Sequence, residues 1–82
     1  MSARVQVIRE VLRGEPGYWR LALQWGLYVY ENGTSDYGYR FIWRRPDGSL
    51  QPARGQARLP SVHVIEELIA RARAEGWGEH EG

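Results

Sequence analysis

The chain of 82 residues contains no cysteine and no lysine. Without cysteine it forms no disulfide, and most structural zinc sites are excluded as well. Without lysine it has no amine for a Schiff base or for general-base catalysis, so all eleven basic side chains are arginines. A domain of this size buries only about 60 % of the surface of its unfolded chain. We therefore expect its stability to depend on dense packing of its four Trp, five Tyr and one Phe.

Long apolar runs are also missing. Arg4, Arg9 and Arg13 interrupt the N-terminal segment, which excludes the apolar region of a signal peptide. No segment approaches the roughly 18 apolar residues of a membrane span. These absences predict a soluble, cytoplasmic protein with no membrane partner.

The clearest positive signal is the alternation of residue types over 18–30. Its odd positions are all apolar, namely Trp19, Leu21, Leu23, Trp25, Leu27 and Val29. A period of two places them on one face of a β-strand, and we assign that face to the core. Gly26 within this strand predicts a bulge or bend.

Two further strands are expected after this one. The polar run 31–36 contains Asn-Gly and predicts a hairpin connection, and the alternating aromatic residues of 37–45 predict a strand whose aromatic face joins the core. The sequence Pro46-Asp47-Gly48 is typical of a tight turn. A third strand is expected within 50–59, at an edge or partly as a loop because of Pro52.

The two ends of the chain indicate helices with unequal clarity. In 2–14 the apolar residues fall on one half of a helical projection, although the β-branched content favours a strand; we assign a short helix because strand alternation fails at Ile8 and Leu12. At the C-terminal end, Ser61 is expected to cap an amphipathic helix that ends at Gly76, with Trp77 folding back on it.

These elements predict a two-layer α+β domain over 1–77, with a frayed tail at 78–82. Its architecture is a three-stranded antiparallel β-meander packed against the C-terminal helix, to which the ambiguous N-terminal segment adds a short helix.

No residue cluster has the spacing of a catalytic, metal or cofactor site. The imidazoles are His63, on the polar side of the expected helix, and His80, in the tail, and neither has partners at ligand spacing. Glu66 and Glu67 diverge by about 100° on a helix, which does not suit a cooperating acid and base. The sequence therefore predicts a protein that is not an enzyme, with no cofactor and no small-molecule substrate.

One octamer, 37–44, partly resembles the RNP1 motif of RNA-recognition domains. Gly38, Tyr39, Phe41 and Ile42 match that motif, whereas Arg40 stands where Gly or Ala belongs. The βαββαβ order of the family does not fit the elements expected here, so membership is not inferred. What remains is that aromatic and arginine side chains on a sheet can stack on bases and contact phosphates.

Two functions from different classes follow. The first is an interaction module that binds another protein, or itself as a homodimer, through the sheet face opposite the core, because Tyr and Arg are favoured at interfaces. The residues of that predicted surface are Arg20, Gln24, Tyr28, Tyr30, Arg40, Ile42 and Arg44.

The alternative is a nucleic-acid-binding domain in which Tyr side chains stack on bases. Its cations are Arg40 and Arg44 together with Arg45, Arg54 and Arg58; against these five, Asp47 is the one acid between Tyr37 and Ile65, a local excess of +4. Protein binding is favoured, since the net charge of the whole chain is only +1. A third interpretation is that Tyr and Arg merely cover a half-exposed sheet, with the arginine content reflecting coding bias.

Overall fold

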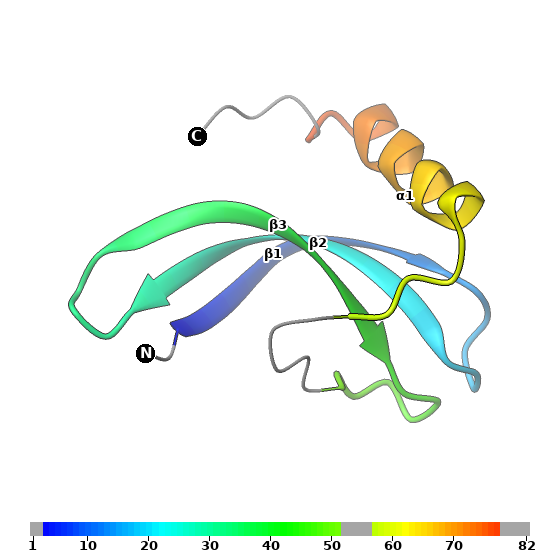
Figure 1. Ribbon diagram of the computed structural model, residues 1–82, viewed down its shortest axis with the longest axis horizontal. Coiled ribbons are helices and arrows are strands. Elements are labelled where there is room, and N and C mark those ends of the chain that lie inside the picture. The colour runs from blue at the N-terminus through cyan, green and yellow to red at the C-terminus, as the bar shows by residue number, and fades with distance from the viewer. Residues whose placement is uncertain (1–2, 52–56, 78–82) are drawn as a thin grey trace.

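The computed structural model describes residues 3–51 and 57–77. Three strands, β1 (Ala3–Arg13), β2 (Arg20–Tyr30) and β3 (Ser35–Arg44), precede one helix, α1 (Val62–Ala74). The strands form one antiparallel sheet in the order β1-β2-β3. Figure 1 shows the sheet bending strongly along its length, with α1 over the end next to the β1–β2 turn. The predicted α+β meander is confirmed, and the expected tail at 78–82 lies outside the described residues.

The helix predicted for 2–14 is wrong, because Ala3–Arg13 forms strand β1. The pairing of β1 with β2 shifts register between Val7 and Arg9, so Ile8 is an extra residue in a β-bulge. A bulge changes the phase of the alternation, and for this reason the strand pattern fails in the sequence. The glycine expected to mark a bulge, Gly26, lies across from it: a side chain at Gly26 would come within 2.8 Å of the Gln6 carbonyl oxygen.

The bulge also decides which face each residue of β1 occupies. Val5, Val7 and Leu12 share one face, opposite Tyr28, Gly26 and Ala22 respectively. Val11 lies on the other face, beneath α1, where it is buried. An unbroken strand would have placed Val11 with Val5 and Val7, and Leu12 on the opposite face.

The strand expected within 50–59 is also wrong for the residues that can be described. Leu50 makes an isolated bridge to Arg44, and the Gln51 N–H donates to the Trp43 carbonyl at 2.9 Å. Residues 57–60 are not in a strand, and Pro52 and Gly55 lie outside the described residues. The third strand of the meander is therefore the N-terminal one, and β3 is an edge strand.

The turn before Leu50 is the one predicted. The Gly48 N–H donates to the Arg45 carbonyl at 2.8 Å, and Gly48 has a φ of 90°, which glycine adopts without strain. The Asp47 carboxylate accepts from the backbone N–H and the hydroxyl of Ser49, at 2.9 and 2.7 Å. These hydrogen bonds stabilise the charged form and lower the pKa of Asp47 from its ordinary value of 3.8.

Helix α1 also begins and ends as expected. The Ser61 hydroxyl accepts from the Val64 N–H, and Gly76, with a φ of 83°, allows the Trp77 N–H to return to the Ala72 carbonyl. Trp77 thus folds back on the helix as predicted, and it is buried in the core.

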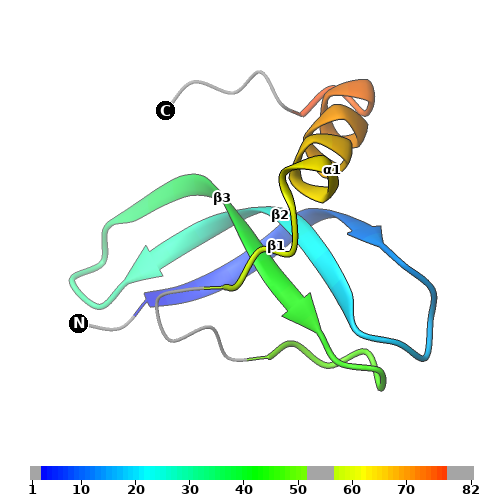
Figure 2. The ribbon, with the colours of Figure 1, turned by 45° about the vertical axis from the view of Figure 1, so that its right-hand side comes forward.

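The core lies between α1 and half of the sheet. Its buried residues come from all parts of this contact: Val11, Leu21, Leu23, Trp25, Val64, Leu68, Ala72 and Trp77, with Phe41 and Trp43 packed against them. Within the described residues the backbone of α1 lies close to β1 and β2 but not to β3. Leu27 and Val29, on the same predicted core face, are therefore only half-buried. Figure 2 shows α1 standing over one end of the sheet, while the other end extends beyond it.

Candidate functional site

The predicted interaction surface lies on the sheet face away from α1, which we call the outer face. Even-numbered residues of β2 and β3 occupy this face in register, with Arg20 opposite Arg44 and Gln24 opposite Arg40. The structure thus brings together on one face all seven residues of that surface: Arg20, Gln24, Tyr28, Tyr30, Arg40, Ile42 and Arg44.

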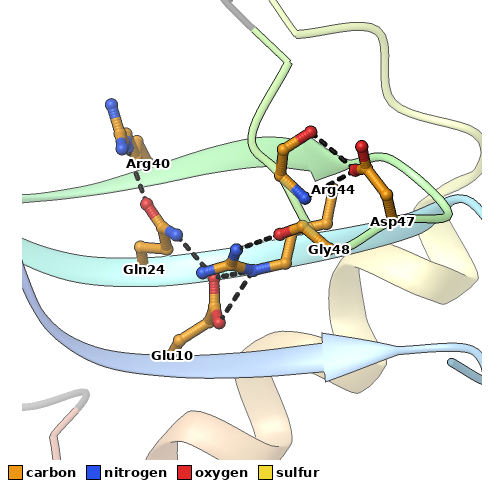
Figure 3. Close-up of polar contacts among 7 residues, drawn as sticks. Glu10, Gln24, Arg40, Arg44, Asp47 and Gly48 are labelled. Atoms are coloured by element: carbon orange, nitrogen blue, oxygen red, sulfur yellow. Dashed lines mark hydrogen bonds and ion pairs between the residues drawn. The ribbon is translucent and has the colours of Figure 1, made fainter.

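The centre of the outer face is occupied by a polar network, shown in Figure 3, which we call the Glu10 network: Glu10, Gln24, Arg40 and Arg44. Gln24, 1 % exposed, donates to the Glu10 carboxylate and accepts from Arg40 Nε at 2.8 Å. Arg44 Nε binds both Glu10 oxygens, at 3.1 and 2.9 Å, and Arg44 Nη1 donates to the Gly48 carbonyl at 2.6 Å. The functional groups at this centre therefore already have partners within the chain.

Glu10 is the residue that sequence reasoning missed. Once β1 is a strand with a bulge, Glu10 lies opposite Gln24, which lies opposite Arg40, so one row of the sheet holds an acid, an amide and a base. An acid and a base on the two outer strands, joined by an amide on the strand between them, form a recognisable signal. This signal can be recognised only once the register of β1 is known.

Apolar residues beside this network on the outer face differ in exposure, and Val7, opposite Gly26, is 41 % exposed. Ile42 is buried, and its neighbour Ala22 is fully buried. Tyr28 is half-buried and lies over Gly38, where an added Cβ would come within 3.3 Å of its ring.

The arginines expected to contact nucleic acid do not gather into one site. Arg45 Nη1 lies within hydrogen-bond distance of Ser49 Oγ and the Leu50 carbonyl, at 3.4 and 3.3 Å. Arg58 is exposed, and its carbonyl accepts from Trp43 Nε1 at 2.7 Å. Arg54 lies outside the described residues. Arg40 and Arg44 belong to the Glu10 network, so two further cations of that set already have partners.

A different surface appears on the helix side of the sheet, beyond α1. Four rings contact one another in series in the order Trp77, Tyr39, Trp25 and Tyr37, with centroid separations of 5.8, 4.4 and 5.4 Å; the two outer pairs are stacked and the middle pair is tilted by 40°. We call these rings the aromatic row. The Tyr39 hydroxyl donates to the Trp77 carbonyl. The aromatic face of β3 was predicted to join the core, and Phe41 and Trp43 do pack against it, but Tyr37 is 55 % exposed and Tyr39 37 %.

A groove of about 250 Å³ lies beside this row, where the backbones of α1 and β3 are farther apart than those of α1 and β2. We call it the β3–α1 groove, and its lining is Leu23, Tyr39, Phe41, Ile69, Ala72 and Arg73. Ile69, an apolar residue of α1, is 38 % exposed here. In the described part of the chain, Arg73 makes no ion pair and no side-chain hydrogen bond.

The titratable side chains of the described residues are spread over the molecule. In 3–51 and 57–77, no three His, Cys, Asp or Glu side chains lie close enough together to hold a metal ion. His63 is exposed on α1, and the lowered pKa of Asp47 is accounted for by its own turn. None of the helical residues described forms a helix long and apolar enough to cross a membrane.

Comparison with protein-family models, with curated proteins and with solved structures finds no match to this chain.

Proposed function

We propose that the chain is a non-enzymatic interaction module that binds another protein, or a second copy of itself, through the helix-side surface around Tyr37, Tyr39 and Ile69. The observation that carries this proposal is the incomplete cover of the sheet by α1. It leaves Tyr39 and Ile69 partly exposed where they line an apolar groove, and the exposed Tyr37 follows Tyr39 in the aromatic row through Trp25. Contiguous apolar patches with aromatic residues are typical of protein interfaces.

The chemistry of this surface favours protein over the other classes of ligand. The β3–α1 groove has a volume of about 250 Å³, which is below the range of roughly 300–1,000 Å³ usual for small-molecule sites. Binding of a nucleic acid requires several free cations along a backbone path. Among the residues that line the groove, Arg73 is the single cation, and on the outer face Arg40 and Arg44 have partners. The proposed binding surface therefore lies on the helix side of the sheet, opposite to the outer face predicted from the sequence.

The test compares three purified chains as baits in extracts and as proteins in solution. These are the natural chain, the double variant Tyr37→Ser/Ile69→Ser, and the control Tyr18→Ser, which removes a ring that is 68 % exposed in the β1–β2 turn. If the partner is another protein, we expect the natural chain and the control to capture the same protein from the extract. If the partner is a second copy, both should show a melting temperature that rises with their own concentration. The double variant should lose both properties while keeping its helical and sheet circular dichroism.

Three results would overturn the proposal. One is equal protein capture by all three baits. Another is a monomer at high micromolar concentration that captures nothing. The third is binding of single-stranded RNA or DNA whose affinity falls steeply with salt and is unchanged in the double variant, which would support the nucleic-acid alternative.

A further inference from the structure

The outward edge of β3 is open beside the β3–α1 groove. Gln51 donates to the Trp43 carbonyl, so the backbone groups of Trp43 point away from β2. In an antiparallel ladder the N–H and C=O groups of alternate residues point to the same side. Those of Tyr37, Tyr39 and Phe41 therefore also point outward, and within the described residues these backbone groups have no hydrogen-bond partner.

We infer that this edge binds an extended peptide segment of a partner protein as an added strand, with an apolar side chain in the groove and a carboxylate on Arg73. The inference rests on the proposed function and names the class of partner. Addition of a strand to an exposed edge supplies backbone hydrogen bonds for affinity, while pockets for alternate side chains supply specificity.

The geometry of the edge matches this mode of binding. A residue paired with Tyr39 or Phe41 has its side chain on the same face as theirs, and both rings line the groove. The lining also includes the exposed side chain of Ile69, which an apolar side chain of the added strand would cover.

Charge complementarity selects the sequence of the segment. Arg73 is the single charged residue among those that line the groove, and in the described part of the chain it has no acidic partner. A guanidinium binds a carboxylate through two parallel hydrogen bonds. The preferred segment therefore has apolar residues and one acidic residue at alternate positions, so that all of them lie on the face of the added strand that meets the groove.

The probes are blocked peptides of sequence Thr-Val-Thr-Leu-Thr-Glu-Thr and its reverse, which place the acid at either end of the groove. Matched peptides carry Lys in place of Glu, and a further pair is N-methylated at alternate amides to block backbone pairing. Binding is measured by NMR chemical-shift titration, and amide hydrogen exchange is measured for Tyr37, Tyr39 and Phe41. The proteins are the natural chain, Arg73→Glu, and Arg4→Glu as a control of equal charge change at another exposed position.

We expect one acidic peptide to bind and to slow exchange at those three amides. It should bind roughly two- to fivefold more tightly than its Lys counterpart, as for an exposed ion pair, and Arg73→Glu should reverse that preference while Arg4→Glu should not. N-methylation should weaken binding about tenfold or more by removing two or more hydrogen bonds.

No shift at about millimolar peptide, or affinity indifferent to both N-methylation and Arg73→Glu, would overturn the inference. If the extract experiment still gave capture that depends on Tyr37 and Ile69, the proposed function would stand without it. If the same amides became protected as the concentration of the chain alone was raised, a second copy would be the occupant and the acidic peptide would be excluded.

Discussion

On the outer face of the sheet, Glu10, Gln24, Arg40 and Arg44 bind one another across three strands, whereas on the helix side the exposed Tyr37 stacks on Trp25 and otherwise faces solvent. The first region is polar and internally satisfied. The second is apolar and incompletely covered. Arg and Tyr content alone does not separate a surface that holds the chain together from one that is free to bind.

The position of α1 produces this difference. Its buried residues Val64, Leu68 and Ala72 pack on the core residues of β1 and β2, and in the described part of the chain its backbone lies close to these two strands but not to β3. The half of the sheet beneath α1 therefore carries the stability of the fold, and the half beyond it carries the proposed binding surface. Substitutions beneath α1 should therefore lower stability, and substitutions beyond α1 should weaken binding.

The largest effect on stability is expected at the centre of the helix contact. Leu68 is fully buried, so Leu68→Ala should lower the free energy of unfolding by roughly 2–5 kcal/mol. The neighbouring Ile69 is 38 % exposed, and Ile69→Ala should cost less than about 1 kcal/mol. Urea denaturation measures both changes, and equal losses would show that the helix faces the sheet in a different register.

A second, smaller effect is expected from breaking the Glu10 network. Glu10→Ala leaves the buried Gln24 amide and Arg44 Nε without their acceptor, which should cost about 1–3 kcal/mol. Glu15→Ala, in the exposed β1–β2 turn, should change stability by less than about 0.5 kcal/mol. Thermal unfolding of the two variants makes the comparison, and a neutral Glu10→Ala would mean that the network adds no net stability.

Strands β2 and β3 and helix α1 could be predicted because their signals are local, whereas the strand expected within 50–59 is absent from the residues that can be described. Alternation over 18–30, the turn at Pro46-Asp47-Gly48 and the cap at Ser61 each depend on neighbouring residues. The turn and the cap appear as expected, and the alternating strand begins at Arg20, which leaves Trp19 outside it and 50 % exposed. The N-terminal strand could not be predicted in the same way. Its bulge at Ile8 lies against Gly26 of another strand, so the break in the alternation belongs to the pairing of two strands and not to the local sequence.

The candidate site depends even more on tertiary placement. The outer-face residues were correctly grouped, since period-two alternation determines a face. Their mutual pairing depends on Glu10, whose position follows from the register of β1. The exposure of Tyr37 follows from where α1 ends relative to β3, and no property of the residues around Tyr37 specifies that distance.

Replacing Tyr37, the exposed ring of the aromatic row, should weaken binding while changing stability little. Tyr37→Ser removes a side chain that is 55 % exposed and stacked on Trp25, so stability should fall by only about 0.5–1 kcal/mol. Binding of the acidic peptide should weaken in the same variant. Calorimetric unfolding and peptide titration together test this. A loss of stability as large as that of Leu68→Ala would show that the ring belongs to the core.

The smallest effect is expected in the turn that holds the Gly48 carbonyl against Arg44. Hydrogen bonds from Ser49 lower the pKa of Asp47 below its ordinary value of 3.8, so near this pH the folded chain binds a proton there less readily than the unfolded chain. The stability from Asp47 is therefore present above about 3.8 and is lost as the pH falls through the lower, folded pKa. Because this carboxylate is exposed, the natural chain should be only slightly more stable than Asp47→Asn near neutral pH, and this difference should decrease in acid. Carbon-detected NMR titration should give a midpoint below 3.8 for Asp47, and Ser49→Ala should move it back toward that value; an unchanged midpoint in Ser49→Ala would contradict this cause.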